Sequence, residues 1–189
     1  NQTKQSFPVL LGWWESENLQ NRHLWPGINI DFGGDALNVD ETVNQIMLTR
    51  GMLPESKGTV HWSIGPLLKY PNVSKALLDG PYQKEALVPA SLWMHDVLPA
   101  APKVEAKVVQ DKVEINWGHS DIDEVFKWVV YFKYNGVWSY EILSRTQNSF
   151  ELSYLQNKNE KGSHLTDVGV TAVDRTGNES DFIEVSVGG

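Results

Sequence analysis

The stretch KWVVYFKYNGVWSYEIL, residues 127–143, decides the fold of the second half of the chain. Two runs rich in aromatic and β-branched residues, Lys127–Tyr134 and Val137–Leu143, stand on either side of Asn135-Gly136. An Asn-Gly pair between two such runs is a common connection of antiparallel strands, because both residues tolerate a positive φ. The stretch therefore predicts two neighbouring strands joined by a tight turn.

Further short runs of the same character lie on both sides of this pair, and turn residues such as Thr176-Gly177-Asn178 separate several of them. The seven expected strands are 103–109, 112–117, 127–134, 137–143, 149–154, 167–174 and 182–187. Seven short strands within about 90 residues are typical of a β-sandwich. Trp117, near the end of the second strand, is expected in its core under the opposite sheet.

The seam between the two halves is Leu98-Pro99-Ala100-Ala101-Pro102, a stretch that favours extended backbone and cannot continue a helix. Before it, apolar residues recur at helical spacing between short strand-like runs; after it, alternating strands dominate. The sequence therefore predicts one domain over residues 1–98 and a second over residues 99–189.

The first half has the order helix, strand, helix, strand, helix, with strands expected within residues 23–30 and 57–64. Such an order predicts parallel strands with a right-handed crossover. Two parallel strands make too small a sheet to stand alone, since both faces need covering, and a full barrel needs about 250 residues. We expect an α/β plus all-β chain: a partial (β/α) barrel remnant, whose larger upstream part is missing, followed by a β-sandwich.

Composition excludes several classes of function. A net charge of −8 argues against a nucleic-acid or anionic-membrane partner, and no apolar run is long enough for a membrane span. With no cysteine and five histidines scattered at spacings unlike those of ligands, no metal site is expected. No glycine-rich phosphate loop supports a cofactor. The chain starts at Asn1 without Met and is interpreted as a processed or excised product.

Four motifs in the first half are similar to those of a known protein family. They are residues 22–27 (RHLWPG), 43–50 (VNQIMLTR), 60–63 (VHWS) and 86–93 (ALVPASLW). In this order, over roughly residues 6–97, they resemble the C-terminal part of glycosyl-hydrolase-like proteins related to glycoside hydrolase family 10. The resemblance implies the last strands and helices of a TIM barrel. It also implies an exported bacterial protein or lipoprotein that is periplasmic, on the cell surface or secreted.

The second half is similar to a fibronectin type III domain through the run Val170–Ser180. Such domains often follow the barrel in the family. One position departs from the pattern, because many of these domains carry a tyrosine shortly before the run and Val168 stands there. A tyrosine corner is therefore not expected.

The candidate substrate-binding residues are Trp62, His61, Ser63 and Asp31. The first three stand where the second strand ends, at the side where barrel active sites form. Trp62 either lines a sugar site or packs under the next helix, and His61 or Ser63 would hydrogen-bond sugar hydroxyls. Asp31 either faces the site or begins the turn at Gly33-Gly34. Glycoside hydrolysis needs two carboxyl groups, and because neither strand ends in an obvious pair, no catalytic residue is assigned.

Three hypotheses remain open. The first is the C-terminal fragment of a polysaccharide-acting glycoside hydrolase that is not catalytic by itself and needs the missing N-terminal barrel portion. The second is a stand-alone module that binds carbohydrate or protein through its tryptophans, of which the chain has eight. The third is a homo-oligomer that completes the half-barrel, since open strand edges seek partners.

Overall fold

The computed structural model describes residues 5–31, 36–55, 58–156 and 164–188. It divides into two compact units, Asn1–Glu85 and Ala86–Gly189, which are described one at a time. The contact boundary falls at Glu85/Ala86, ahead of the expected boundary at 98/99. Its physical basis is the hydrogen bonding of residues 86–98 to the second unit, described below.

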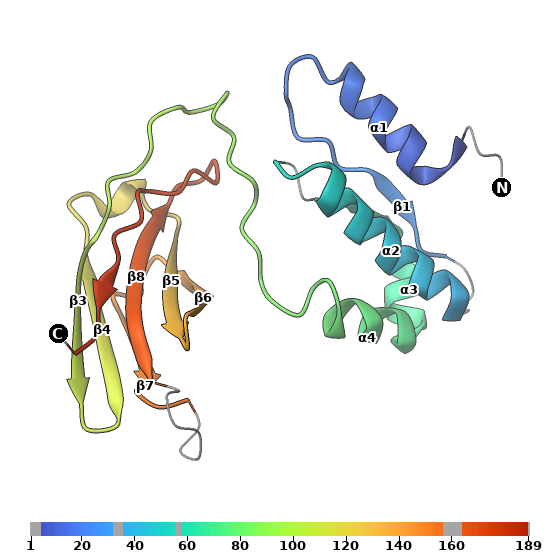
Figure 1. Ribbon diagram of the computed structural model, residues 1–189. Coiled ribbons are helices and arrows are strands. Elements are labelled where there is room, and N and C mark those ends of the chain that lie inside the picture. Colours follow the sequence, from blue (N-terminus) through green and yellow to red (C-terminus); the bar gives the residue numbers. More distant parts are fainter. Residues whose placement is uncertain (1–4, 32–35, 56–57, 157–163, 189) are drawn as a thin grey trace. The chain divides into compact units, whose positions relative to one another are not determined.

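The N-terminal unit contains four helices and two short strands among its described residues (Figure 1). In chain order these are α1 Phe7–Glu17, β1 Gly27–Asn29, α2 Ala36–Met52, β2 Val60–Trp62, α3 Ile64–Lys69 and α4 Pro71–Asp79. The strands β1 and β2 pair in parallel, with Ile28 opposite His61 and Asn29 opposite Trp62. The expected alternation of helices and parallel strands is therefore confirmed, whereas a barrel remains a prediction.

Helices cover one face of the β1–β2 pair. Ile28 and Ile30 point to this face and are each 1% exposed. They form a buried cluster with residues of α2 and α4, namely Val39, Ile46, Val73 and Leu77. Alternation along the strands turns the next side chains to the opposite face, where Asn29, Val60 and Trp62 are all exposed. Among the described residues of this unit, the small sheet is thus covered on one face.

The helix α2 begins at Ala36 and has Val39 and Ile46 buried, whereas Met47 and Met52 are exposed. In α1, Leu11 is the buried residue, and Val9, Leu10, Trp13 and Trp14 face solvent. Both helices therefore expose apolar side chains that a periodicity argument would have buried.

The second unit is a β-sandwich. Its strands are β3 Lys103–Val109, β4 Lys112–Gly118, β5 Lys127–Tyr134, β6 Val137–Ser144, β7 Ser149–Ser153, β8 Leu165–Val173 and β9 Val185–Ser186, with a 3-10 helix at Ile122–Glu124. Three strands form one sheet in the order β3-β4-β7, and four form the other in the order β6-β5-β8-β9 (Figure 1). Six of the seven expected strands formed to within two residues at each end, whereas the seventh, expected at 182–187, is reduced to the two-residue β9.

The core of the sandwich lies between its two sheets. Val113, Ile115 and Trp117 of β4 meet Trp128 and Val130 of β5, and all five are at most 5% exposed. Trp117 and Trp128 pack edge to face with ring centroids 6.0 Å apart, so the core position expected for Trp117 is confirmed. Val168, which stands where the fibronectin type III pattern often has tyrosine, is fully buried in β8.

Candidate functional site

The carboxyl ends of β1 and β2 form the candidate site of the N-terminal unit. Because the strands are parallel and in register, Asn29 and Trp62 end them side by side, and the Ile30 amide donates to the Trp62 carbonyl at 3.1 Å. Asp31 follows β1 and Ser63 follows β2, and both are exposed. The fold thus brings three of the four predicted residues, Asp31, Trp62 and Ser63, to one edge. The Trp62–Ser63 peptide bond is cis.

Trp62 is the most prominent side chain of this edge, with 73% of its surface exposed. It does not pack under the helix that follows, which was the alternative interpretation of its position. Ile64 and Leu68 of α3 are also exposed, at 70% and 79%. An exposed tryptophan beside further apolar side chains at the end of a parallel strand is a surface suited to contact with a ligand.

His61 points the other way, into the face that the helices cover. Its Nε2 lies 2.7 Å from the hydroxyl of Tyr82, which also lies 2.9 Å from Thr59 Oγ1. Its Nδ1 is buried without a hydrogen-bond partner among the described residues. Burial lowers the pKa of His61, so the ring is neutral at pH 7. The structure therefore separates His61 from Trp62 and joins it to Tyr82.

Two residues near the predicted set were not anticipated from the sequence. Tyr82 lies beyond α4, and no local pattern connects it with His61. Lys69, at the end of α3, is close enough to feel the charge of Asp31: its pKa is raised, first by the Tyr70 hydroxyl and further by the negative charge of Asp31. The edge around Trp62 thus carries a hydroxyl, from Ser63, and a carboxylate, from Asp31.

An open pocket of about 670 Å³ lies on the exposed side of α2. It is lined by Glu41, Asn44, Met47, Leu48, Gly51 and Met52. Met52 also lies near α1, since a Cβ on Gly12 would be 3.5 Å from its Cε. The lining is mostly apolar and offers one carboxylate, so the pocket is better suited to packing than to chemistry.

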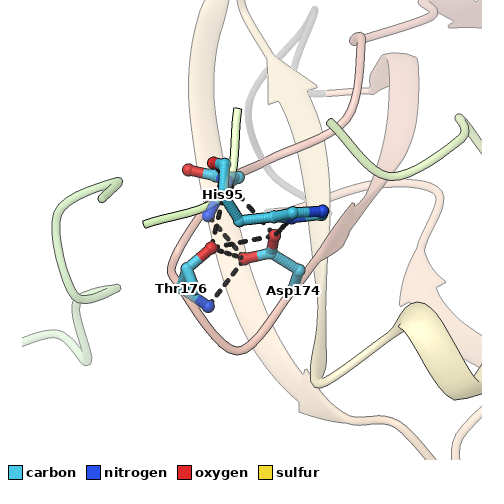
Figure 2. A network of polar contacts seen from close by, with 4 residues as sticks. His95, Asp174 and Thr176 are labelled. Carbon is cyan, nitrogen blue, oxygen red and sulfur yellow. Dashed lines mark hydrogen bonds and ion pairs between the residues drawn. The ribbon is translucent and has the colours of Figure 1, made fainter. Parts of the chain in front are cut away.

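A polar network surrounds Asp174 in the second unit (Figure 2). Asp174 follows directly after β8, and its Oδ1 accepts hydrogen bonds from the Thr176 amide at 2.8 Å and the Asn178 amide at 2.9 Å. Its Oδ2 lies 3.3 Å from His95 Nδ1. Burial alone would raise the pKa of Asp174, but the hydrogen bonds from Thr176, Asn178 and His95 outweigh it and lower the pKa.

The same network holds the segment 86–98 against the sandwich. The Asn178 side-chain amide donates to the His95 carbonyl at 2.6 Å, and the Ser91 amide donates to the Thr176 carbonyl at 2.9 Å. Gly177 lets the loop after β8 come close to this segment, because a Cβ at Gly177 would lie 2.7 Å from the Val88 carbonyl oxygen. These contacts explain why residues 86–98 belong to the second unit.

The Asp174 network lacks the chemistry of a nucleophilic triad. A triad needs a hydroxyl whose proton passes to histidine, which the carboxylate orients from its other side. The Thr176 hydroxyl instead donates directly to Asp174, at 2.8 and 3.0 Å to the two carboxylate oxygens. Among the described residues, His, Asp and Glu side chains do not gather in any group of three that could hold a metal ion. We interpret the network as structural.

None of the helices within the described ranges has the length and apolar character needed to cross a bilayer. No known protein-family model matches the chain. By sequence, the chain is 36% identical over 115 residues to the glycosyl hydrolase YngK of Bacillus subtilis. That alignment covers 57% of this chain and 22% of the Bacillus protein, so the chain spans about a fifth of its relative's length.

Some solved structures also align with the backbone of this chain. The spore cortex lytic enzyme SleM of Clostridium perfringens aligns with 96% of this chain and 74% of its own, at 16% identity and a TM-score of 0.41. An FN3 domain of human collagen XX aligns with 53% of this chain and 99% of its own, at 19% identity and a TM-score of 0.36. The chain thus has a glycosyl hydrolase among its relatives by sequence and an FN3 domain among its neighbours by structure.

Proposed function

We propose that this chain is part of a bacterial glycoside-hydrolase-like protein that acts on a polysaccharide, and that the edge around Trp62 contacts the sugar. One observation carries the proposal: an indole that is 73% exposed stands at the carboxyl end of a parallel strand, beside Ser63 and Asp31. Flat aromatic rings stack on the apolar faces of sugar rings, while hydroxyl and carboxylate groups bind sugar hydroxyls. The 36% identity to a glycosyl hydrolase supports this substrate class.

The one-sided covering of the β1–β2 pair supports a larger sheet. Parallel strands are normally buried on both faces, yet Val60 is 50% exposed on the open face. In the proposed parent protein, further βα units would lie beside these strands and complete a barrel. Carboxyl ends of barrel strands are where such enzymes carry their active sites, and there the edge around Trp62 would form part of the wall.

In this proposal the chain alone does not hold the complete catalytic machinery. Hydrolysis needs an acid and a second carboxylate across the scissile bond. Asp31 offers one carboxyl group at the edge, and Asp35 lies outside the described residues. Asp31 and Ser63 would bind sugar hydroxyls, whereas His61, facing Tyr82, would position strand β2 rather than touch the sugar. An exported location, periplasmic, surface-bound or secreted, belongs to the same proposal.

Binding of soluble oligosaccharides to the full 189-residue chain tests the role of Trp62. Titration with cellohexaose and xylohexaose, followed by tryptophan fluorescence, is expected to show saturable binding that Trp62→Ala weakens roughly tenfold, as loss of one stacked ring should. Trp25→Ala is the matched control, because Trp25 is 41% exposed but stands before the amino end of β1. Equal loss in both variants, or no binding to any sugar, would count against the proposal.

The exposed apolar faces of α1 and α2 favour one alternative, in which the chain associates with itself or with another protein. Trp13 and Trp14 are more than half exposed, and Met47 is 53% exposed on the neighbouring helix. Light scattering at increasing concentration distinguishes this case. A clean monomer throughout would exclude a homo-oligomer that completes the barrel.

A further inference from the structure

The outer face of the four-stranded sheet carries aromatic side chains where a sandwich normally exposes polar ones. Trp128 and Val130 of β5 point into the core. Side chains alternate between the two faces of a strand, so Tyr131, which follows Val130, points outward. Its partner across β6 is Tyr140, and their ring centroids are 6.3 Å apart. Two residues before Tyr140 on the same face stands Trp138, opposite the outward-pointing Lys133.

Phe182 completes this cluster from the segment that follows β8. It lies over Gly169, where a Cβ would come within 2.3 Å of the Phe182 ring. The ring is nearly perpendicular to Tyr131 on one side and to Trp138 on the other, with both centroids 5.3 Å away. We call Tyr131, Trp138, Tyr140 and Phe182 the outer aromatic strip.

Polar contacts fix the strip in place. The Tyr131 hydroxyl donates to Glu179 at 2.7 Å, which also accepts from the Thr171 hydroxyl. The Lys133 ammonium lies 5.1 Å from the Trp138 ring centroid and forms ion pairs with Asp167 and Glu184, both at 3.2 Å. Rings held by such contacts lose little conformational freedom when a ligand binds.

Part of the strip still reaches solvent. Trp138 is 37% exposed and Phe182 is 44% exposed, and Ile183, next to Phe182 in sequence, is 53% exposed. Two partly exposed rings are too small a surface for a stable protein interface, which needs about 1,000 Å² or more in total. A narrow, extended ligand that covers one or two rings at a time matches this size.

The charged groups around the outer aromatic strip indicate which chemical class of ligand fits it. The ammonium group of Lys133, which lies over Trp138, is already paired with two carboxylates. The carboxylates of Glu179 and Glu184 contact Tyr131 and Lys133, and the exposed Asp181 precedes Phe182 in sequence. Anionic ligands would be repelled here, whereas the hydroxyls of an uncharged sugar would find carboxylate acceptors and its apolar C–H faces would find aromatic rings.

We propose that the outer aromatic strip is a binding site for an uncharged polysaccharide chain. The site lies in the sandwich unit and uses none of the residues around Trp62. It extends the carbohydrate role proposed above and is tested through a different set of residues. The sandwich would then hold a polysaccharide by itself instead of serving only as a spacer.

The test uses the full chain in native gels that contain hydroxyethylcellulose, galactomannan or, as the anionic comparison, polygalacturonate. We expect at least one neutral polymer to retard the protein, with Trp138→Ala and Phe182→Ala each weakening retardation roughly tenfold. Trp93→Ala is the matched control, since Trp93 is 40% exposed in the same unit and outside the strip. Urea unfolding of each variant verifies that it is folded; Trp138→Phe, which keeps a ring, should retain most of the binding if Trp138→Ala fails to fold.

Amide chemical-shift mapping with cellohexaose then separates this site from the edge around Trp62. Shifts in β5, β6 and β8 that vanish in Trp138→Ala support the strip, and shifts confined to β2 and α3 overturn it while leaving the edge in place. Retardation by polygalacturonate alone, equal loss in Trp93→Ala, or no retardation by either neutral polymer would also overturn it. So would self-association that depends on Trp138.

Discussion

The two units differ in how many faces of their sheets are covered. In the sandwich, each sheet turns one face to the other, and Val113, Val130 and Val168 are fully buried between them. In the N-terminal unit, helices cover one face of the β1–β2 pair, and the other exposes Val60 and Trp62. Two tryptophans at strand positions therefore have opposite surroundings: Trp128 is 1% exposed and Trp62 is 73% exposed. The comparison indicates that the sandwich encloses its own core, whereas the first unit presents apolar surface for something else to cover.

The largest loss of stability is expected from Trp128→Ala in the sandwich. The substitution removes a fully buried indole and its hydrogen bond from Nε1 to the Arg145 carbonyl, 3.2 Å away. Loss of a buried aromatic side chain costs about 3–5 kcal/mol of unfolding free energy, a large part of the stability of a domain this size. Urea titration followed by the NMR resonances of β8 measures the sandwich separately from the first unit. A loss below about 1 kcal/mol would contradict the closed core.

Like Asp167, whose pKa is also lowered, Asp174 should contribute to the acid sensitivity of the sandwich. Its pKa in the folded chain is below its unfolded value, which is near 3.9. The ionised carboxylate therefore stabilises the sandwich above that pH, and this contribution is lost as the pH falls through the folded pKa. Asp174→Asn should cost about 1–3 kcal/mol at pH 7 and flatten the dependence of stability on pH below about 4. Asp111→Asn, at an exposed turn, is the control, and an unchanged acid profile in Asp174→Asn would contradict this account.

Gly177→Ala tests how residues 86–98 are attached to the sandwich. Gly177 has φ +80°, and an added Cβ would lie 2.7 Å from the Val88 carbonyl oxygen. Gly136→Ala is a matched control, because Gly136 has φ +77° and open space around it. A residue other than glycine in this backbone region costs about 1–3 kcal/mol of unfolding free energy. Gly177→Ala should cost more than Gly136→Ala, because the added Cβ would also displace residues 86–98. Faster hydrogen exchange at the Ser91 amide in Gly177→Ala alone is the expected signature; equal behaviour of the two variants would show that the segment is loosely held.

The sequence was sufficient for the sandwich because its signals are local. The Asn135-Gly136 turn and the alternation along Lys127–Tyr134 act within a few residues, and the strands formed where these patterns lie. The parallel strands were also expected, because residues 27–30 and 60–64 have the short apolar character of strands.

What the sequence could not supply were contacts between distant residues. His61 and Tyr82 are 21 positions apart, and His95 and Asp174 are 79 positions apart. No periodicity predicts such pairs. Helical spacing also suggested burial of Trp13 and Trp14, which face solvent. A helical period in the sequence identifies an apolar face of a helix, but it does not identify what covers that face. At the candidate edge, strand register was enough to bring Asp31, Trp62 and Ser63 together, whereas the turning of His61 toward Tyr82 depended on where α4 ends.

The smallest effect on stability is expected from Trp62→Ala, the counterpart of Trp128→Ala. With 73% of its surface already exposed, the indole has little to lose on unfolding, and surface substitutions usually stay within about 0.5 kcal/mol. Urea unfolding followed by the NMR resonances of α2 and α4 measures the N-terminal unit. A tryptophan that contributes almost nothing to folding but roughly tenfold to sugar affinity would mark a binding surface. A loss of more than about 1 kcal/mol would instead show that Trp62 packs within the unit, which would remove the main observation behind its proposed role.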